Sequence, residues 1–160
     1  MVRALAILLI LVTVALGQAP TEKSIVIADI ELEMIFVDAG TFTMGSPVEE
    51  PLRDKAEGPQ TKVRLTHPFW LGKTEVTQAQ YEAIIGTNPS RFKEVGPDAP
   101  VEEVSWDDCM KYCEILTERE RAANRLPEGY IYTLPTEAQW EYACRAGTKG
   151  DYAGNPSSMA

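Results

Sequence analysis

The sequence predicts a loop-rich α+β domain. Three short helix patterns each begin with the same capping motif, and several apolar runs of strand length precede them. The connections are long and rich in Pro, Gly and charged residues, which is typical of irregular surface loops. The length allows one domain with a modest core and is too short for two.

Residues 1–19 are predicted to be a secretory signal peptide. Arg3 gives a short positive region, residues 4–16 form an apolar stretch, and small residues at Gly17 and Ala19 fit a cleavage site. The stretch is shorter than the roughly 20 residues that a membrane span needs. We therefore expect a secreted or periplasmic protein that leaves the membrane after cleavage, with an uncleaved membrane anchor as the alternative.

The formal net charge of −9 argues against two classes of partner. Nucleic acid and anionic membrane surfaces both attract basic proteins, so neither is expected here. Removal of the predicted leader takes away Arg3 and makes the remainder more acidic. The charge identifies no partner of its own.

The N-terminal half contains the strand candidates. Residues 20–33 are predicted to be a linker and N-terminal segment, in which Ile25–Leu32 is apolar but of open type. A domain is expected from residue 34 to residue 160. Met34–Val37 and Thr41–Met44 flank a Gly-ending triplet, which predicts a hairpin.

Two more strands are expected beyond a long loop. The residues from Ser46 to Gln60 are rich in Pro, Gly and charge, which predicts a surface loop. Lys62–Leu65 alternates polar and apolar residues, and Phe69–Lys73 follows Pro68 as the next candidate. Both are short.

Each of the three predicted helices is preceded by a hydroxyl residue, and Gln or Asp follows three positions after that residue. Thr77, Ser105 and Thr136 are the expected N-caps, because each hydroxyl can accept from the backbone N–H at N3. The expected helices are Gln78–Ile85, Trp106 to about Ala123, and Glu137–Ala146.

The second helix has the clearest apolar stripe. Helical spacing predicts one buried face and one charged face. The expected buried residues are Trp106, Cys109, Met110, Cys113 and Leu116, and the charged ones are Glu114, Glu118, Arg119 and Arg121.

The three cysteines are Cys109, Cys113 and Cys144, so at least one thiol lacks a partner within the chain. Cys109 and Cys113 share one helix face, where their parallel Cβ directions disfavour a bridge. A Cys113–Cys144 or a Cys109–Cys144 bridge stays open, as does pairing outside the chain. Two thiolates could also bind Cu(I), but buried packing fits this pair better.

Other residues give no catalytic constellation. The single histidine, His67, cannot form a zinc site alone and is expected to be structural. Glu137 and Glu141 are expected to serve the helix dipole and a salt bridge. Acidic residues near the second helix lack calcium-loop spacing and fit its positive N-terminus better; they are Glu102, Glu103, Asp107 and Asp108.

Four segments in order resemble the formylglycine-generating enzyme family, also called the sulfatase-modifying factor domain. They are distributed over about residues 34–148, and their combination is far more specific than any one of them. The segments are Phe36–Ser46 (FVDAGTFTMGS), Phe69–Tyr81 (FWLGKTEVTQAQY), Pro100–Asp108 (PVEEVSWDD) and Leu134–Arg145 (LPTEAQWEYACR).

The resemblance implies a fold related to C-type lectins, in which Trp106, Trp140 and Tyr142 pack in the core or between helices. It implies an enzyme that oxidises a cysteine of a client sulfatase to formylglycine with O₂ and copper. The copper cysteines and the calcium loops of the family lie after the segment that Leu134–Arg145 resembles, and the sequence to Ala160 has no counterpart of them.

The expected chain is therefore the N-terminal portion of such a domain, truncated at its C-terminus. No catalytic, cofactor-binding or metal-binding residue is assigned to it, and copper and calcium are expected only of an intact active member. Cys113 and Cys144 resemble positions that pair with cysteines of the other half in some members. The alternatives are a non-catalytic lectin-like binding module and an inactive fragment.

Overall fold

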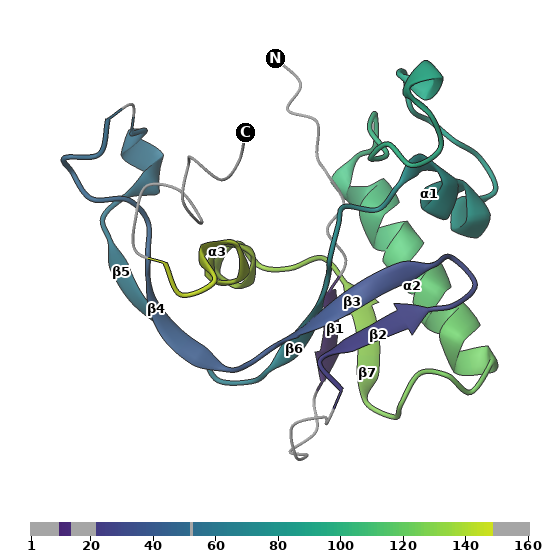
Figure 1. The fold of residues 1–160 in the computed structure, drawn as a ribbon, viewed down its shortest axis with the longest axis horizontal. Coiled ribbons are helices and arrows are strands. Elements are labelled where there is room, and N and C mark those ends of the chain that lie inside the picture. The colour runs from purple at the N-terminus through teal and green to yellow at the C-terminus, as the bar shows by residue number, and fades with distance from the viewer. Residues whose placement is uncertain (1–9, 14–21, 52, 149–160) are drawn as a thin grey trace. The chain divides into compact units, whose positions relative to one another are not determined.

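The computed structural model describes residues 10–13, 22–51 and 53–148, the first range by its backbone alone. The chain forms two compact units. One contains Met1–Val37 and Pro68–Leu134, and the other contains Asp38–His67 and Pro135–Ala160. Each unit combines short antiparallel strands with helix, as the predicted α+β class requires (Figure 1).

The first unit is built on a five-stranded antiparallel sheet with the order β2-β3-β6-β1-β7. Its strands are β1 (Ile10–Thr13), β2 (Ser24–Ile27), β3 (Leu32–Val37), β6 (Phe69–Gly72) and β7 (Tyr130–Thr133). The apolar segment Ile25–Leu32, whose secondary structure the sequence left open, thus starts within β2. Strand β7 was not predicted.

Burial in this sheet follows the two-residue period of a strand. In β3, Leu32, Met34 and Phe36 are buried, and the residues between them are more exposed. Strand β6 is buried at all four residues, as expected for a strand inside a sheet. Phe36 meets Trp70 edge to face, with ring centroids 5.2 Å apart.

Two helices belong to this unit, α1 (Gln78–Ile85) and α2 (Trp106–Ala122). Four side chains of α2 are buried in the same core cluster as residues of the sheet: Cys109, Tyr112, Cys113 and Leu116. The Tyr112 ring stacks on Tyr81 of α1 at 5.5 Å. Complete desolvation raises the pKa of the Tyr112 phenol.

The predicted caps are confirmed at all three α-helices. The Thr77 hydroxyl accepts from the Gln80 N–H at 3.2 Å, while the Gln80 side chain accepts from the Thr77 N–H at 2.9 Å. Ser105 and Asp108 form the same reciprocal pair, and so do Thr136 and Gln139. Gly86 ends α1 at a φ of 87°, in the left-handed region that favours glycine.

The predicted burial of Trp106 is wrong within the described residues, because its side chain is 60% exposed. It is the first residue of α2, and helical side chains lean toward the N-terminus. At this position the indole is exposed and is not part of the core cluster. Trp140 in the third helix is also exposed, at 51%.

The predicted hairpin between Met34–Val37 and Thr41–Met44 is also wrong. Strand β3 pairs with β2 and β6, whereas β4 (Gly40–Met44) pairs with β5 (Thr61–Leu65). The residues between β4 and β5 include the predicted surface loop and the short 3₁₀ turn η1 (Lys55–Glu57). Apolar spacing located the strands but could not say which of them pair.

The second unit packs helix α3 (Glu137–Arg145) against the β4–β5 pair. The Tyr142 ring lies 5.4 Å from that of Phe42, which confirms its predicted packing role. A side chain at Gly40 would collide with the Tyr142 hydroxyl, and one at Gly45 with the Glu57 carbonyl. Glycine is therefore needed at position 45, where the obstacle is backbone and φ is 89°, whereas a side chain at position 40 would require the Tyr142 side chain to shift.

The predicted signal peptide lies mostly outside the described residues and stays a prediction. Within it, Ile10–Thr13 forms β1, between β6 and β7. A second 3₁₀ turn, η2 (Lys93–Val95), lies between α1 and α2. In the part of the chain that the structure describes, no helix has the length and apolar character to cross a membrane.

We expect Thr77→Ala to reduce the free energy of unfolding by about 1 kcal/mol, because it removes the hydroxyl that caps α1. Urea titration followed by circular dichroism measures the change. Thr87→Ala is the matched control, since Thr87 is exposed and lies after the end of α1. Equal losses in the two variants would show that the cap contributes nothing specific.

Candidate functional site

The two thiols of α2 lie inside the core. Cys109 and Cys113 are buried, and desolvation raises their pKa values to about 11 and about 12. A thiolate is the form that binds copper or attacks an electrophile. Both side chains lie in the apolar core cluster and pack there as small apolar groups, and this enclosed apolar setting does not suit a copper site.

Cys144 differs from the α2 pair because it lies exposed on α3. Partial desolvation still raises the pKa of its thiol. All three cysteines are free thiols in the structure, so it contains neither of the bridges to Cys144 that the sequence left open.

Two of the four acidic residues before and within α2 make local structural contacts. The Glu102 carboxylate accepts from the Phe92 N–H at 2.7 Å. Asp108 accepts from the Ser105 hydroxyl and N–H, and these hydrogen bonds lower the pKa of its carboxyl. Within residues 10–13, 22–51 and 53–148, no three His, Cys, Asp or Glu side chains are grouped to hold a metal ion.

In the second unit, Glu141 links α3 to β4. Its carboxylate accepts from the Gly45 N–H at 2.8 Å and from Arg145 Nε at 2.8 Å. Arg145 also donates to the Gly45 carbonyl at 3.1 Å. The salt bridge expected of Glu141 is thus present, while Glu137 is exposed at the start of the helix.

The single histidine makes one local contact. His67 is exposed, and its Nδ1 lies 2.9 Å from the Thr66 hydroxyl oxygen. Among the residues that the structure describes, no carboxylate or thiol contacts this imidazole to form a catalytic pair. Its predicted structural character fits this arrangement.

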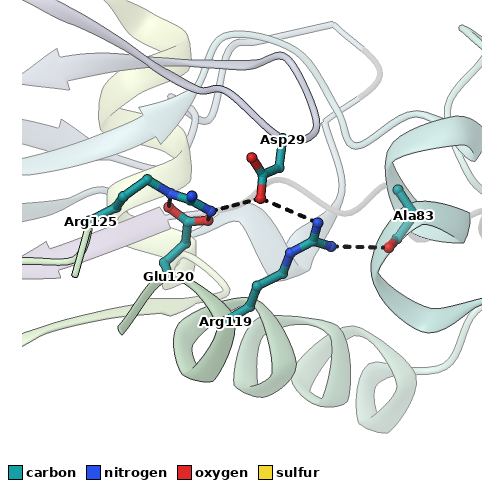
Figure 2. Close-up of polar contacts among 5 residues, drawn as sticks. All are labelled: Asp29, Ala83, Arg119, Glu120 and Arg125. Atoms are coloured by element: carbon teal, nitrogen blue, oxygen red, sulfur yellow. Dashed lines mark hydrogen bonds and ion pairs between the residues drawn. The ribbon is translucent and has the colours of Figure 1, made fainter. Parts of the chain in front are cut away.

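A network of four charged side chains gathers at the C-terminal end of α2 (Figure 2). Arg125 contacts Glu120 through two parallel hydrogen bonds of 3.0 and 2.7 Å. The Glu120 side chain is only 4% exposed, so its charge needs this partner. The contact in turn raises the pKa of the Arg125 guanidinium.

Asp29 joins this pair to the rest of the network. It lies between β2 and β3 and accepts from Arg125 at 2.7 Å and from Arg119 at 3.3 Å. Arg119 also donates to the Ala83 carbonyl of α1 at 3.2 Å (Figure 2). The network therefore connects the β2–β3 turn and α1 to the end of α2. Each of its carboxylates forms an ion pair with a guanidinium of the same network.

Sequence reasoning missed this network, although one signal was present. Glu120 lies four residues after Leu116, on the same helical stripe as Cys109 and Cys113. A carboxylate on a buried stripe requires a cation nearby. Asp29 could not be found in this way, because it lies 96 positions from Arg125.

The exposed side of α2 has a shallow hollow of about 410 Å³ lined by four of its residues, Asp107, Met110, Lys111 and Glu114. Lys111 and Glu114 form an exposed ion pair at 2.7 Å across it. Such pairs contribute little, and no buried polar group in this hollow points toward a ligand. The hollow is ordinary helix surface.

The family of the chain follows from a profile match over most of its length. Residues 27–158 match the sulfatase-modifying factor enzyme 1-like domain. The chain therefore belongs to the family of formylglycine-generating sulfatase-modifying factors, as its four sequence blocks predict.

Sequence similarity to individual proteins supports the same family assignment. The chaperone protein LppX of Paenibacillus barcinonensis is 30% identical over 98% of this chain and 61% of its own length. Formylglycine-generating enzyme of Bos taurus is 24% identical over 72% of the chain and 40% of its own length, and that of Mus musculus is 25% identical over the same shares.

A solved structure supports the fold. PvdO from Pseudomonas aeruginosa matches with a TM-score of 0.71 and 25% identity, over 87% of this chain and 56% of that one. The chain thus spans between about two fifths and three fifths of the length of these relatives.

We expect Arg125→Met to lower the free energy of unfolding by about 3 kcal/mol, because it leaves the buried Glu120 carboxylate without its partner. Glu120→Gln should cost less, about 1 kcal/mol, since the half-exposed Arg125 keeps Asp29 and water. Urea unfolding of both variants measures the order. Lys111→Met, in an exposed pair, is the control and should stay within about 0.5 kcal/mol. The reverse order would contradict the network.

We expect one of the three thiols to react with iodoacetamide much faster than the other two at pH 8 in the folded chain. Cys144 is exposed, whereas Cys109 and Cys113 are buried and protonated. Peptide mapping by mass spectrometry identifies the labelled residue, and labelling in urea provides the control in which all three react. Rapid labelling of Cys113 without urea would show that the core is open.

Proposed function

We propose that this protein is an exported member of the sulfatase-modifying factor family whose function is directed at another protein. The similarity to two formylglycine-generating enzymes supports a client that presents a cysteine, such as a sulfatase. The apolar N-terminal segment supports export. Export, client and activity are all part of the proposal, because the chain spans 40% of those enzymes.

The role proposed for residues 27–148 is that of scaffold. The observation that carries it is the burial of Cys109 and Cys113, whose thiols are held protonated in the core. If family chemistry occurs in a longer form, its copper thiolates must come from other residues. The described residues contribute a rigid core and the faces of α2 and α3, and they take no part in oxygen chemistry.

A second candidate is a non-catalytic module that binds other proteins. The similarity to a protein named as a chaperone covers almost the whole chain. Exposed apolar side chains would suit contacts with a client; the aromatic ones are Phe92, Trp106 and Trp140. A chaperone-like module would bind a client without changing its cysteine.

The test incubates the full chain with a synthetic sulfatase peptide that contains the target cysteine, in air and with Cu(I). We expect mass spectrometry to find the cysteine unoxidised, because the α2 thiols cannot act as copper ligands. Bovine formylglycine-generating enzyme serves as the positive control. Conversion that depends on Cys109 and Cys113 would overturn the scaffold role.

The same samples separate the two candidates. Binding to the cysteine peptide but not to its serine analogue would support a sulfatase-type client. Equal binding to many unfolded proteins would favour the chaperone-like module.

For export, we expect the intact mass of the secreted or periplasmic product to correspond to a chain that begins at Gln18 or Pro20. A product that retains residues 1–19 would contradict cleavage.

A further inference from the structure

The β4–β5 pair of the second unit has two faces of different character. Phe42 lies on the face that contacts α3, through Tyr142, and its register partner Val63 shares that face (Figure 1). Side chains alternate between the two faces along a strand. The opposite face therefore carries two cross-strand pairs whose members are all exposed: Thr41 with Arg64, and Thr43 with Lys62.

Lys62 and Arg64 are cations without a counter-charge in the part of the chain that the structure describes. Neither side chain forms an ion pair or a hydrogen bond there. Arg145 of the same unit, by contrast, is paired with Glu141. The cross-strand neighbours of the two cations are threonines, which bring no charge. Two positive charges on one face are thus available to a partner.

Strand β5 also has an unpaired edge. The sheet that it forms with β4 has two strands among the described residues. Outside the ladder with β4, the backbone of Thr61–Leu65 makes no hydrogen bond to any described residue. Such a row of N–H and C=O groups can pair with an additional strand. In strand addition, main-chain hydrogen bonds give affinity, and the neighbouring side chains decide which strand fits.

The spacing of the two cations defines the strand that fits. Lys62 and Arg64 are two positions apart, which is about 7 Å along a strand. A strand that pairs with β5 presents its own side chains on this face with the same period. Acidic residues at two alternate positions would therefore lie beside both cations. Two consecutive acidic residues would not, because one of them would point to the face where α3 packs.

A second role of these cations is to exclude another copy of the chain. Charged residues on an edge strand prevent two molecules from pairing edge to edge. Two β5 strands in antiparallel pairing would bring cation near cation, which is unfavourable. The same charges favour a strand of opposite sign. The net charge of −9 does not prevent this, since exposed charges are screened beyond about 8 Å.

We propose that the edge of β5 is a binding site for an extended segment of a separate protein with acidic residues at alternate positions. The segment adds to β5 as a third strand, and two of its carboxylates lie beside Lys62 and Arg64. Backbone pairing holds the segment, and the two charges select it. The site lies in the second unit and goes beyond the proposed function, on which it does not depend.

The test measures the binding of labelled peptides to the full chain by fluorescence anisotropy. The peptide TEVEVT carries glutamate at alternate positions, and TVEEVT has the same composition with the two glutamates adjacent. The variant Lys62→Glu/Arg64→Glu reverses both cations of the site. Arg91→Glu/Lys93→Glu is the matched control, since it reverses an exposed pair of the same types and spacing in the first unit.

We expect TEVEVT to bind about fivefold more tightly than TVEEVT, because only TEVEVT places both carboxylates beside cations. Reversal of the cations should weaken TEVEVT binding about tenfold, and a TKVKVT peptide should bind the reversed variant in its place. That exchange of preference also shows that the variant is folded. The control variant should bind TEVEVT as the unmodified chain does.

Hydrogen exchange with mass spectrometry tests the backbone pairing. We expect the amides of Thr61–Leu65 to exchange more slowly when TEVEVT is bound, because a third strand protects them. Binding that leaves these amides unchanged would overturn the strand site. This readout does not depend on export or on activity toward a client.

Other results would also overturn the proposal. Equal binding of TEVEVT and TVEEVT would remove the role of spacing. An equal loss in the control variant would show attraction to any positive surface, and failure of TKVKVT to bind the reversed variant would show that charge does not select the strand. Vesicles of phosphatidylserine and phosphatidylcholine provide the last arm. If they bind the chain through Lys62 and Arg64 while TEVEVT does not, a membrane is the occupant.

Discussion

The first unit depends on the burial of one face of α2 against the sheet. Cys109, Tyr112, Cys113 and Leu116 exclude water from that face, and the apolar side of β3 lies in the same cluster. Removal of apolar area from water is the main driving force for such packing. The same face brings Glu120 into the interior, which explains why a charge network closes the end of the helix.

This packing also decides what the cysteines can do. A pair of thiols at i and i+4 would suit a soft metal if it faced solvent or a polar cavity. Here the pair faces the core, and desolvation holds both thiols protonated. The family relationship and the absence of a suitable thiolate pair among the described residues are therefore compatible.

The charge network and the position of β1 both join residues that lie far apart in the sequence. Asp29 meets Arg119 and Arg125, which lie 90 and 96 positions away, and β1 lies between strands that begin at residues 69 and 130. Neither arrangement has a local signal apart from the acidic residue on the α2 stripe. Both tie the ends of the first unit together, so both are sensitive places for mutation.

The sequence by itself determined the helices, their caps and the family. A cap joins residues three positions apart, so Thr77 with Gln80 and Ser105 with Asp108 can be read from spacing alone. Tertiary structure alone decided that β3 and β4 join different sheets, that Trp106 is exposed at the start of α2, and that Ile10–Thr13 lies between β6 and β7. Strand pairing is chosen among distant segments of similar composition, and no local pattern distinguishes them.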